Sequence, residues 1–224
     1  MGLLLSACQN DSSVIVYADP WLSEFADQIE LVYEKEYPNR DLQVKEISSE
    51  VIAQHLHFGQ PVDVFLCFGP SFLRADVKEM IGEEVTLAAS RILLLRGQSD
   101  SRQAQFKTKG CTVVSASDRP LRNYAELAFP SYFHSDSCKI IADFPAQTQD
   151  YLTRAWVRQG FVPAHFAEQK SAIFEVVAEG PLIVNAFCAI KPLDPPHKTA
   201  ADDLMRVLSS PESKKILADL GYVP

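Results

Sequence analysis

The first residues that could carry chemistry form a short turn near the start of the chain. Residues 18–22 read Ala-Asp-Pro-Trp-Leu and join an apolar run, residues 14–17, to a segment of helical periodicity. Such a turn suits anions, because free backbone N–H groups and the positive end of the helix dipole meet there. This turn instead carries the carboxylate of Asp19 and the indole of Trp21, which favour a cation, a zwitterion or an organic molecule stacked on the ring. Plain structural roles are the alternatives, with Asp19 as a helix cap and Trp21 as a hydrophobic lid.

A second polar turn, Ser48-Ser49-Glu50, separates an alternating segment, residues 42–47, from another helical segment. Hydroxyl side chains cap helices, and an acid in the first turn of a helix is favoured by the helix dipole. If Asp19 and Glu50 share one cleft, they could also form an acid–base pair, which requires that one carboxyl has a strongly raised pKa. Both a binding and an enzymatic interpretation of these carboxylates therefore stay open.

Other catalytic and metal-binding patterns are weak in this sequence. His55 and His57 lie two apart on a predicted helix, so they face different ways and make a poor metal pair. The segment from His134 to Cys138 has no nucleophile elbow near it, and the chain has no phosphate loop or dinucleotide fingerprint. The sequence therefore predicts neither a metal nor a cofactor.

Cys8 ends the tetrapeptide Leu-Ser-Ala-Cys, which resembles a bacterial lipobox. In that motif the chain is cut before the cysteine, and the thiol then receives a lipid. Residues 1–13 are thus interpreted as a lipoprotein signal remnant and a polar tether, which predicts a periplasmic protein held to the membrane by its lipid anchor only. Spacing leaves open whether the other cysteines form disulfides or lie buried as thiols. These are Cys67, Cys111, Cys138 and Cys188.

Length and charge exclude two further classes. The 224 residues carry a formal net charge of −8 and no basic run, which argues against a nucleic-acid-binding protein. No apolar stretch approaches the roughly 18 residues that a membrane-spanning helix needs. The chain is long enough to form one large domain or two small ones.

Apolar periodicity predicts strands and helices that alternate along the chain, which is typical of an α/β fold. The predicted strands cover residues 14–17, 42–47, 62–66, 92–95, 111–114 and 182–184. The predicted helices cover residues 22–37, 50–58, 71–80, 149–159, 172–179, 199–208 and 211–220, while residues 123–145 show no clear period. Parallel sheets bind ligands at the carboxyl ends of their strands. The turns at 18–22, 48–50 and 68–71 are therefore expected to line a binding site.

Three segments resemble the molybdate-binding proteins of bacterial ABC importers. Residues 54–65, Q-H-L-H-F-G-Q-P-V-D-V-F, are similar to the family segment Q-Q-I-x-x-G-x-P-A-D-V-F. Residues 87–95 and 208–222 resemble the family's L-A-x-N-x-L-V-L-V and its terminal F-L-x-S-P-E-A-Q-x-I-L-x-x-x-G-F. The resemblance covers nearly all of residues 14–224.

The resemblance implies an α/β protein of the type II periplasmic-binding-protein class, with two mixed sheets flanked by helices and a ligand cleft between two lobes. Lobe I would comprise residues 14–86 plus 190–224, and lobe II residues 87–189. Two crossovers would join the lobes, which close on the ligand by a hinge motion.

The family's ligand contacts transfer only partly to this chain. Trp21 stands where the family has a serine, whereas Ser48 and Ser49 match the family's second serine turn and Glu50 replaces its glycine. In the far lobe, Lys170 falls within the counterpart of an N-V-R turn, and Asn185 corresponds to a tyrosine at a strand end. The expected ligand-binding set is Asp19, Trp21, Ser48, Ser49, Glu50, Lys170 and Asn185.

The resemblance implies an exported, monomeric solute-binding protein that delivers a molybdate- or tungstate-like oxyanion to an ABC permease and is not an enzyme. Asp19 and Glu50 oppose that ligand, because a carboxylate about 4–5 Å from a dianion costs several kcal/mol at partly buried dielectric. A cationic, zwitterionic or small organic ligand is the alternative. Two alternatives from other classes are a cleft enzyme that uses Asp19 and Glu50 as an acid–base pair, and the effector domain of a cytosolic regulator.

Overall fold

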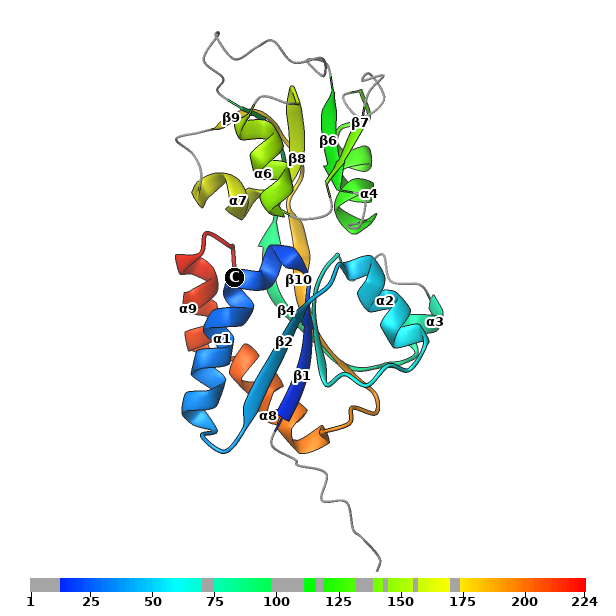
Figure 1. Cartoon of the computed structure of the whole chain (residues 1–224), viewed down its shortest axis with the longest axis vertical. Helices are drawn as coiled ribbons and strands as arrows, with labels where there is room; N and C mark the ends of the chain where they lie inside the picture. Colours follow the sequence, from blue (N-terminus) through cyan, green and yellow to red (C-terminus); the bar gives the residue numbers. More distant parts are fainter. Residues whose placement is uncertain are drawn as a thin grey trace, which may run out of the picture.

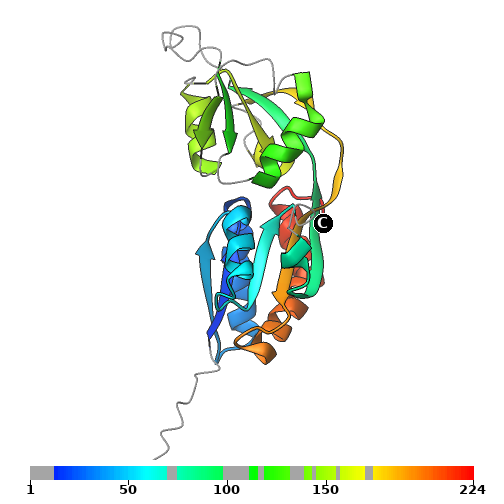
Figure 2. The same cartoon turned by 90° about the vertical axis from the view of Figure 1, so that its right-hand side faces the viewer.

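The computed structural model describes residues 13–69, 75–97, 111–115, 119–131, 139–142, 145–154, 157–169 and 174–224. These residues form two α/β lobes, each built on one five-stranded sheet and stacked along the long axis of the molecule (Figure 1). Two chain segments run between the lobes, along one side of the molecule in Figure 2. The two-lobed α/β fold that the sequence predicts is therefore confirmed.

Lobe I is built on a sheet in which β1, β2 and β3 are parallel and β10 is antiparallel to both β3 and β4. The strand order is β2-β1-β3-β10-β4. The strands are β1 (Ser13–Ala18), β2 (Asp41–Glu46), β3 (Val64–Phe68), β4 (Ile81–Ser90) and β10 (Ile183–Pro192).

Helices cover both faces of this sheet. Side chains on β1 point alternately to the two faces and so belong to two apolar clusters, each of which needs a cover of helices. Val14 and Val16 pack with one group of helices, and Tyr17 packs with the other. The first group is α1 (Ser23–Glu36), α8 (Lys198–Leu208) and α9 (Pro211–Asp219). The second group is α2 (Ser49–His57) and α3 (Ala75–Lys78). A short 3-10 helix, η1 (Pro20–Leu22), links β1 to α1.

Lobe II repeats the plan, with β6, β7 and β8 parallel and β5 antiparallel to both β8 and β9. The strand order is β7-β6-β8-β5-β9. The strands are β5 (Ile92–Gly97), β6 (Thr112–Ser115), β7 (Lys139–Ala142), β8 (Gln159–Pro163) and β9 (Phe174–Glu179), and the flanking helices are α4 (Arg119–Ala128), α6 (Pro145–Thr153) and α7 (Ala164–Gln169). Residues 92–95 of β5 are all buried, as expected for an apolar strand covered on both faces.

Two helices predicted in lobe II differ from the structure. The helix predicted over residues 172–179 is wrong, because residues 174–179 form the edge strand β9 and pair with β5. The helix predicted over residues 149–159 ends at Thr153, and Gln159 already begins β8. In both segments, pairing with neighbouring strands overrides a local pattern that also fits a helix.

The two crossovers lie side by side. The first passes from β4 to β5 around Arg91, whose guanidinium donates to the carbonyl of Gly180 in the second crossover, at 3.1 Å. The amide of Gly180 donates to the carbonyl of Ile92 at 2.8 Å. A Cβ at Gly180 would lie 3.1 Å from that carbonyl oxygen, so this close approach suits glycine. The expected lobe boundaries at 86/87 and 189/190 fall inside β4 and β10, which pair within the sheet of lobe I.

Candidate functional site

The parallel strands of the two lobes point at each other. In lobe I, β4 leads into lobe II, β10 runs antiparallel to β4, and β3 runs antiparallel to β10, so β1, β2 and β3 end at the junction with lobe II. In lobe II, β8 is antiparallel to β5 and its Pro163 pairs with Ile92, so β6, β7 and β8 end facing lobe I (Figure 1). Ligands of open α/β sheets bind at such strand ends. We therefore take the junction between the lobes as the candidate binding site.

Asp19 lies at this junction, directly after β1, and its side chain is fully buried. One carboxylate oxygen, Oδ1, accepts a hydrogen bond from the amide of Trp21 at 3.0 Å. The other, Oδ2, accepts from the amide and the hydroxyl of Ser49, at 2.9 and 2.6 Å. Both oxygens are thus held by donors of the protein itself.

Ser49 extends this network to a third strand end. Its hydroxyl oxygen accepts a hydrogen bond from the amide of Phe68, the last residue of β3, at 2.9 Å. The amide of Asp19 donates to the carbonyl of Leu66 at 2.8 Å. The ends of β1, β2 and β3 are therefore fixed around one carboxylate.

The environment of Asp19 opposes its ionisation. Burial raises the pKa of this carboxyl to about 6, against the lowering effect of hydrogen bonds from Ser49 and Trp21, and Glu46 adds repulsion. A raised pKa is what the acid–base hypothesis requires. The carboxylate oxygens are nevertheless enclosed, while Glu50 is partly exposed on the first turn of α2, so the two predicted partners do not share an open surface.

Ser48, another predicted site residue, has a side-chain hydroxyl that lacks a hydrogen-bond partner in the described structure. It is the N-cap residue of α2, with extended backbone angles, but its side chain makes no capping hydrogen bond. Only 7% of the residue is exposed, and its hydroxyl has no partner within the described part of the chain. A buried hydroxyl left in this way costs about 1–3 kcal/mol, which a bound ligand or a water can recover.

Trp21 connects the two lobes. The residue is 6% exposed, and its ring meets the ring of Phe166 edge to face, with 5.5 Å between centroids. The ring of His165 lies 6.3 Å away in the same helix, α7 of lobe II. Trp21 therefore packs as the hydrophobic lid that the sequence allowed, with little of its surface left to act as an open platform.

His165 was not expected from the sequence. Its ring stacks on Tyr222 at 4.0 Å and meets Phe187 edge to face at 5.4 Å. The hydroxyl of Tyr222 donates to the carbonyl of Trp21. Burial lowers the pKa of His165 to about 3, against a smaller raising effect from the backbone of Trp21, so the ring is neutral at physiological pH. The only sequence signal for this cluster is the Gly-Tyr pair in the terminal segment.

A second aromatic contact joins the lobes on the side of β3. The ring of Phe68 meets that of Tyr124, on α4 of lobe II, edge to face at 5.6 Å. Phe68 also contacts Phe187 of β10, with 5.0 Å between ring centroids. Trp21 and Phe68, whose rings contact lobe II, also donate their backbone amides to the Asp19–Ser49 network.

The remaining predicted site residues are placed less clearly. Lys170 and Cys8 lie outside the described residues. Asn185 lies on β10 in the sheet of lobe I, and not at a strand end of lobe II as the resemblance implied, because β10 is itself the returning crossover strand. The adjacent carbonyl of Ala186 accepts from Gly69 at 2.7 Å, which places Asn185 near the end of β3.

Asp63 of the Pro-Val-Asp-Val-Phe segment has a structural role. Its buried carboxylate accepts hydrogen bonds from the amide of Ile15 at 2.8 Å and from the amide of His197 at 2.7 Å. It also lies 2.9 Å from Nδ1 of His197. Asp63 immediately precedes β3, at the edge of the sheet away from lobe II, so this part of the resemblance reports packing and not ligand binding.

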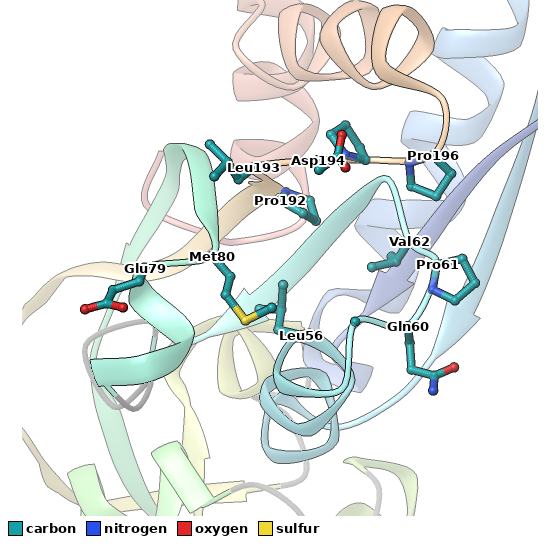
Figure 3. Close-up of a pocket in the computed structure, with 12 residues that line it drawn as sticks. Leu56, Gln60, Pro61, Val62, Glu79, Met80, Pro192, Leu193, Asp194 and Pro196 are labelled. Carbon is teal, nitrogen blue, oxygen red and sulfur yellow. The ribbon is translucent and has the colours of Figure 1, made fainter.

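A pocket of about 660 Å³ lies at that same far edge (Figure 3). Its walls are mainly apolar, with Leu56, Met80 and Leu193 among the lining residues, and Glu79 and Asp194 are its acidic residues. The strand ends at the junction are not part of it. We assign no ligand to this pocket.

The cysteines of the described residues include both free thiols and a disulfide-bonded residue. Cys67 and Cys188 are free and buried, opposite one another on β3 and β10. Cys111 is disulfide-bonded. Cys138 lies outside the described residues.

The described residues contain no group of three or more His, Cys, Asp or Glu side chains arranged to hold a metal ion. None of the helices in this part of the chain combines the length and the hydropathy that crossing a membrane requires.

Comparison with known proteins gives structural neighbours only. No protein-family model matches the chain, and no curated protein matches it. The periplasmic molybdate-binding protein of Azotobacter vinelandii is similar over 94% of this chain and 99% of its own, with a TM-score of 0.67 and 16% identity. PEB3 with bound L-phospholactate is similar over 94% and 99%, with a TM-score of 0.66 and 11% identity. A mutant OxyR2 regulatory domain from Vibrio vulnificus is similar over 88% and 94%, with a TM-score of 0.63 and 11% identity.

At these identities the likeness extends to the fold and not to the ligand. Two of these neighbours bind a small molecule, and the third is a regulatory domain. The chain therefore has the two-lobed α/β fold shared by periplasmic molybdate-binding proteins and their structural relatives.

Proposed function

We propose that this chain is an exported solute-binding protein that captures a small ligand between its lobes and delivers it to an ABC permease as a monomer. The observation that carries the proposal is the hydroxyl of Ser48, buried at the start of α2 with no partner in the described structure. It lies at the strand ends where the two sheets face each other, next to the Ser49–Asp19 network.

The ligand class follows from the junction between the lobes, where Ser48 lies. The rings of Trp21, Phe68 and Tyr124 form contacts between the lobes. When the lobes separate, these rings offer aromatic surfaces, which suit a ligand with an apolar or aromatic part. We therefore propose a small organic ligand that offers an acceptor oxygen to Ser48, in preference to the molybdate-like oxyanion that the sequence resemblance suggests.

Export and anchoring at Cys8 belong to the same proposal. The Leu-Ser-Ala-Cys tetrapeptide supports them, and so does the disulfide at Cys111, since structural disulfides are typical of oxidising, extracytoplasmic compartments. The likeness to a regulatory domain keeps a cytosolic effector domain as the second candidate. A disulfide and a lipid anchor would both be unusual in such a domain.

The experiment is a melting-temperature screen of the intact protein against organic acids, amino acids, sugars and aromatic metabolites. For any compound that raises the melting temperature, Ser48→Ala should weaken its binding about tenfold, the equivalent of one lost hydrogen bond. Ser213→Ala is the matched control, because the hydroxyl of Ser213 is also buried and unpartnered in the described structure but lies on the first turn of α9.

Two results would contradict the proposal. One is that no compound stabilises the protein and native mass spectrometry finds nothing bound to protein isolated from the periplasm. The other is that a ligand is found whose affinity is lowered equally by Ser48→Ala and by Ser213→Ala, since the junction would then have no special part in binding.

A further inference from the structure

The donors around Asp19 have the arrangement of an anion site. Two of them are backbone amides, at Trp21 before α1 and at Ser49 at the start of α2, and the third is the hydroxyl of Ser49. Amides at helix starts carry partial positive charge and are well suited to anions. All three converge on one group, and that group is the carboxylate of the chain itself.

We propose that Asp19 is a built-in ligand, whose carboxylate fills the anion-binding corner of lobe I and excludes a tetrahedral oxyanion from it. This inference rests on the proposed function, because it names which ligands the same junction rejects. A carboxylate offers two oxygens on one atom, as does one edge of a tetrahedral oxyanion, so it can satisfy the same donors.

Exclusion follows from hydrogen bonding and from charge. The donors held at 2.6 to 3.0 Å by Asp19 are not available to a second anion. An incoming anion would also meet the negative charge of the carboxylate in a poorly screened, buried setting. Ser48 keeps its hydroxyl for a ligand, but one hydroxyl cannot replace three donors. The junction therefore favours a ligand that needs few charged contacts and uses the aromatic surface.

Removing the carboxylate should convert the corner into a true anion site. In Asp19→Ala the donors lose their internal partner, and formate, acetate or molybdate can take its place. Asp19→Asn is the matched control, because it fills the same volume while its side chain carries no negative charge. The three proteins are compared by melting temperature over a concentration series of each anion, with ionic strength held constant by chloride.

In Asp19→Ala the melting temperature should rise by about 3–5 °C for each tenfold increase in anion above the dissociation constant. The intact protein and Asp19→Asn should show only the small common effect that these salts have on any protein. Adding Ser49→Ala to Asp19→Ala should lower the affinity for the anion about tenfold, since one of the three donors is lost.

The inference is overturned if folded Asp19→Ala responds to the anions no more than Asp19→Asn, or if molybdate stabilises the intact protein as strongly as it stabilises Asp19→Ala. If Asp19→Ala does not fold in chloride, it is refolded from urea in formate or molybdate. Recovery only with these anions supports the inference, and no recovery with any of them overturns it. None of these outcomes depends on the organic-ligand screen of the intact protein, which tests the proposed function separately.

Discussion

Asp19 and Asp63 are two buried aspartates that lie next to strands of the lobe I sheet, and each joins separate segments of the chain by hydrogen bonds. Asp63 lies before β3 and ties the turn at His197 to β1, at the edge of the sheet away from lobe II. Asp19 lies after β1 and ties the starts of two helices together, at the edge that faces lobe II. Both are fully buried and hydrogen-bonded. Their position relative to the strand ends, and not their chemistry, is the reason why only Asp19 belongs to the proposed ligand site.

The raised pKa of Asp19 predicts a pH-dependent stability. The folded carboxyl keeps its proton up to about pH 6, whereas the unfolded one loses it near the ordinary value of 3.8. Between these values the folded state binds more protons, so the free energy of unfolding falls as pH rises, by at most about 1.4 kcal/mol per pH unit, and is constant above this window. Urea titrations from pH 4 to 7 should show this slope in the intact protein.

The control for that measurement is Asp19→Asn, in which the slope from this residue disappears. Other groups near the carboxyl, including Glu46, Cys67 and Tyr222, are present in both proteins, so the difference between the two curves isolates Asp19. Parallel curves for the two proteins would show that Asp19 is ionised throughout this range.

At the scale of elements, close packing between strand and helix holds lobe II together. Gly97 at the end of β5 approaches α6 so closely that a Cβ would lie 2.2 Å from the carbonyl oxygen of Leu152. Leu152 and the neighbouring β8 residue Phe161 are both buried in the same core. The sheet and α6 can therefore meet only where the strand has no side chain.

Gly97→Ala should lower the free energy of unfolding by about 1–3 kcal/mol, since the added methyl group meets backbone that cannot move aside cheaply. Arg154→Ala at the end of α6 is the comparison, because its exposed ion pair with Asp150 should contribute less than about 0.5 kcal/mol. Denaturant midpoints measure both. Equal effects of the two changes would mean that α6 is not packed on β5 as described.

At the scale of the whole molecule, two adjacent crossovers and a small number of aromatic contacts hold the lobes together. Arg91 and Gly180 fasten the crossovers to each other, while Trp21 and Phe68 contact α7 and α4 across the junction. Under the proposed function, a ligand enters the junction when these ring contacts separate. Hinge motion about paired crossover strands is the general way in which two-lobed proteins open and close.

If the free protein opens at the hinge to admit a ligand, a ligand found in the screen should hold the lobes closed and so compact the protein relative to its free state. Small-angle scattering should show a smaller radius of gyration at saturating ligand. The ligand should also raise the free energy of unfolding by about 2.7 kcal/mol at a hundred times its dissociation constant. With Ser48→Ala the same compaction should need about ten times more ligand. A bound ligand that leaves the radius of gyration unchanged would contradict the hinge.

The proposed lipid anchoring is also tested at the scale of the whole molecule, because it would decide where the proposed binding site operates. Expressed with a complete lipoprotein signal sequence ahead of Cys8, the protein should incorporate labelled palmitate, and Cys8→Ser should abolish the label. Cys111→Ser, which removes only the disulfide, should leave labelling intact. Label retained in Cys8→Ser would exclude the lipobox interpretation.

The amino-acid sequence by itself determined the elements whose apolar period is regular and whose ends carry clear stop signals. The strands at 14–17 and 42–47 and the helices at 199–208 and 211–220 lie within about one residue of β1, β2, α8 and α9. The order of these elements, with the quoted family segments, was enough to predict two lobes. The turn of Asp19 and Trp21 was also identified from the sequence as the unusual feature.

Only the tertiary structure decided what these residues do. Asp19 and Ser49 are 30 positions apart, and they meet because β1 and β2 are adjacent parallel strands that end at the same edge. His165 and Tyr222 come together because α7 follows a strand of lobe II that ends at the junction and the C-terminal segment returns there. β9 is a strand because β5 offers it an edge. Periodicity is a local property of the chain, whereas the partner of a buried carboxylate, a ring or an edge strand is set by sheet order, which brings together segments that are far apart in sequence.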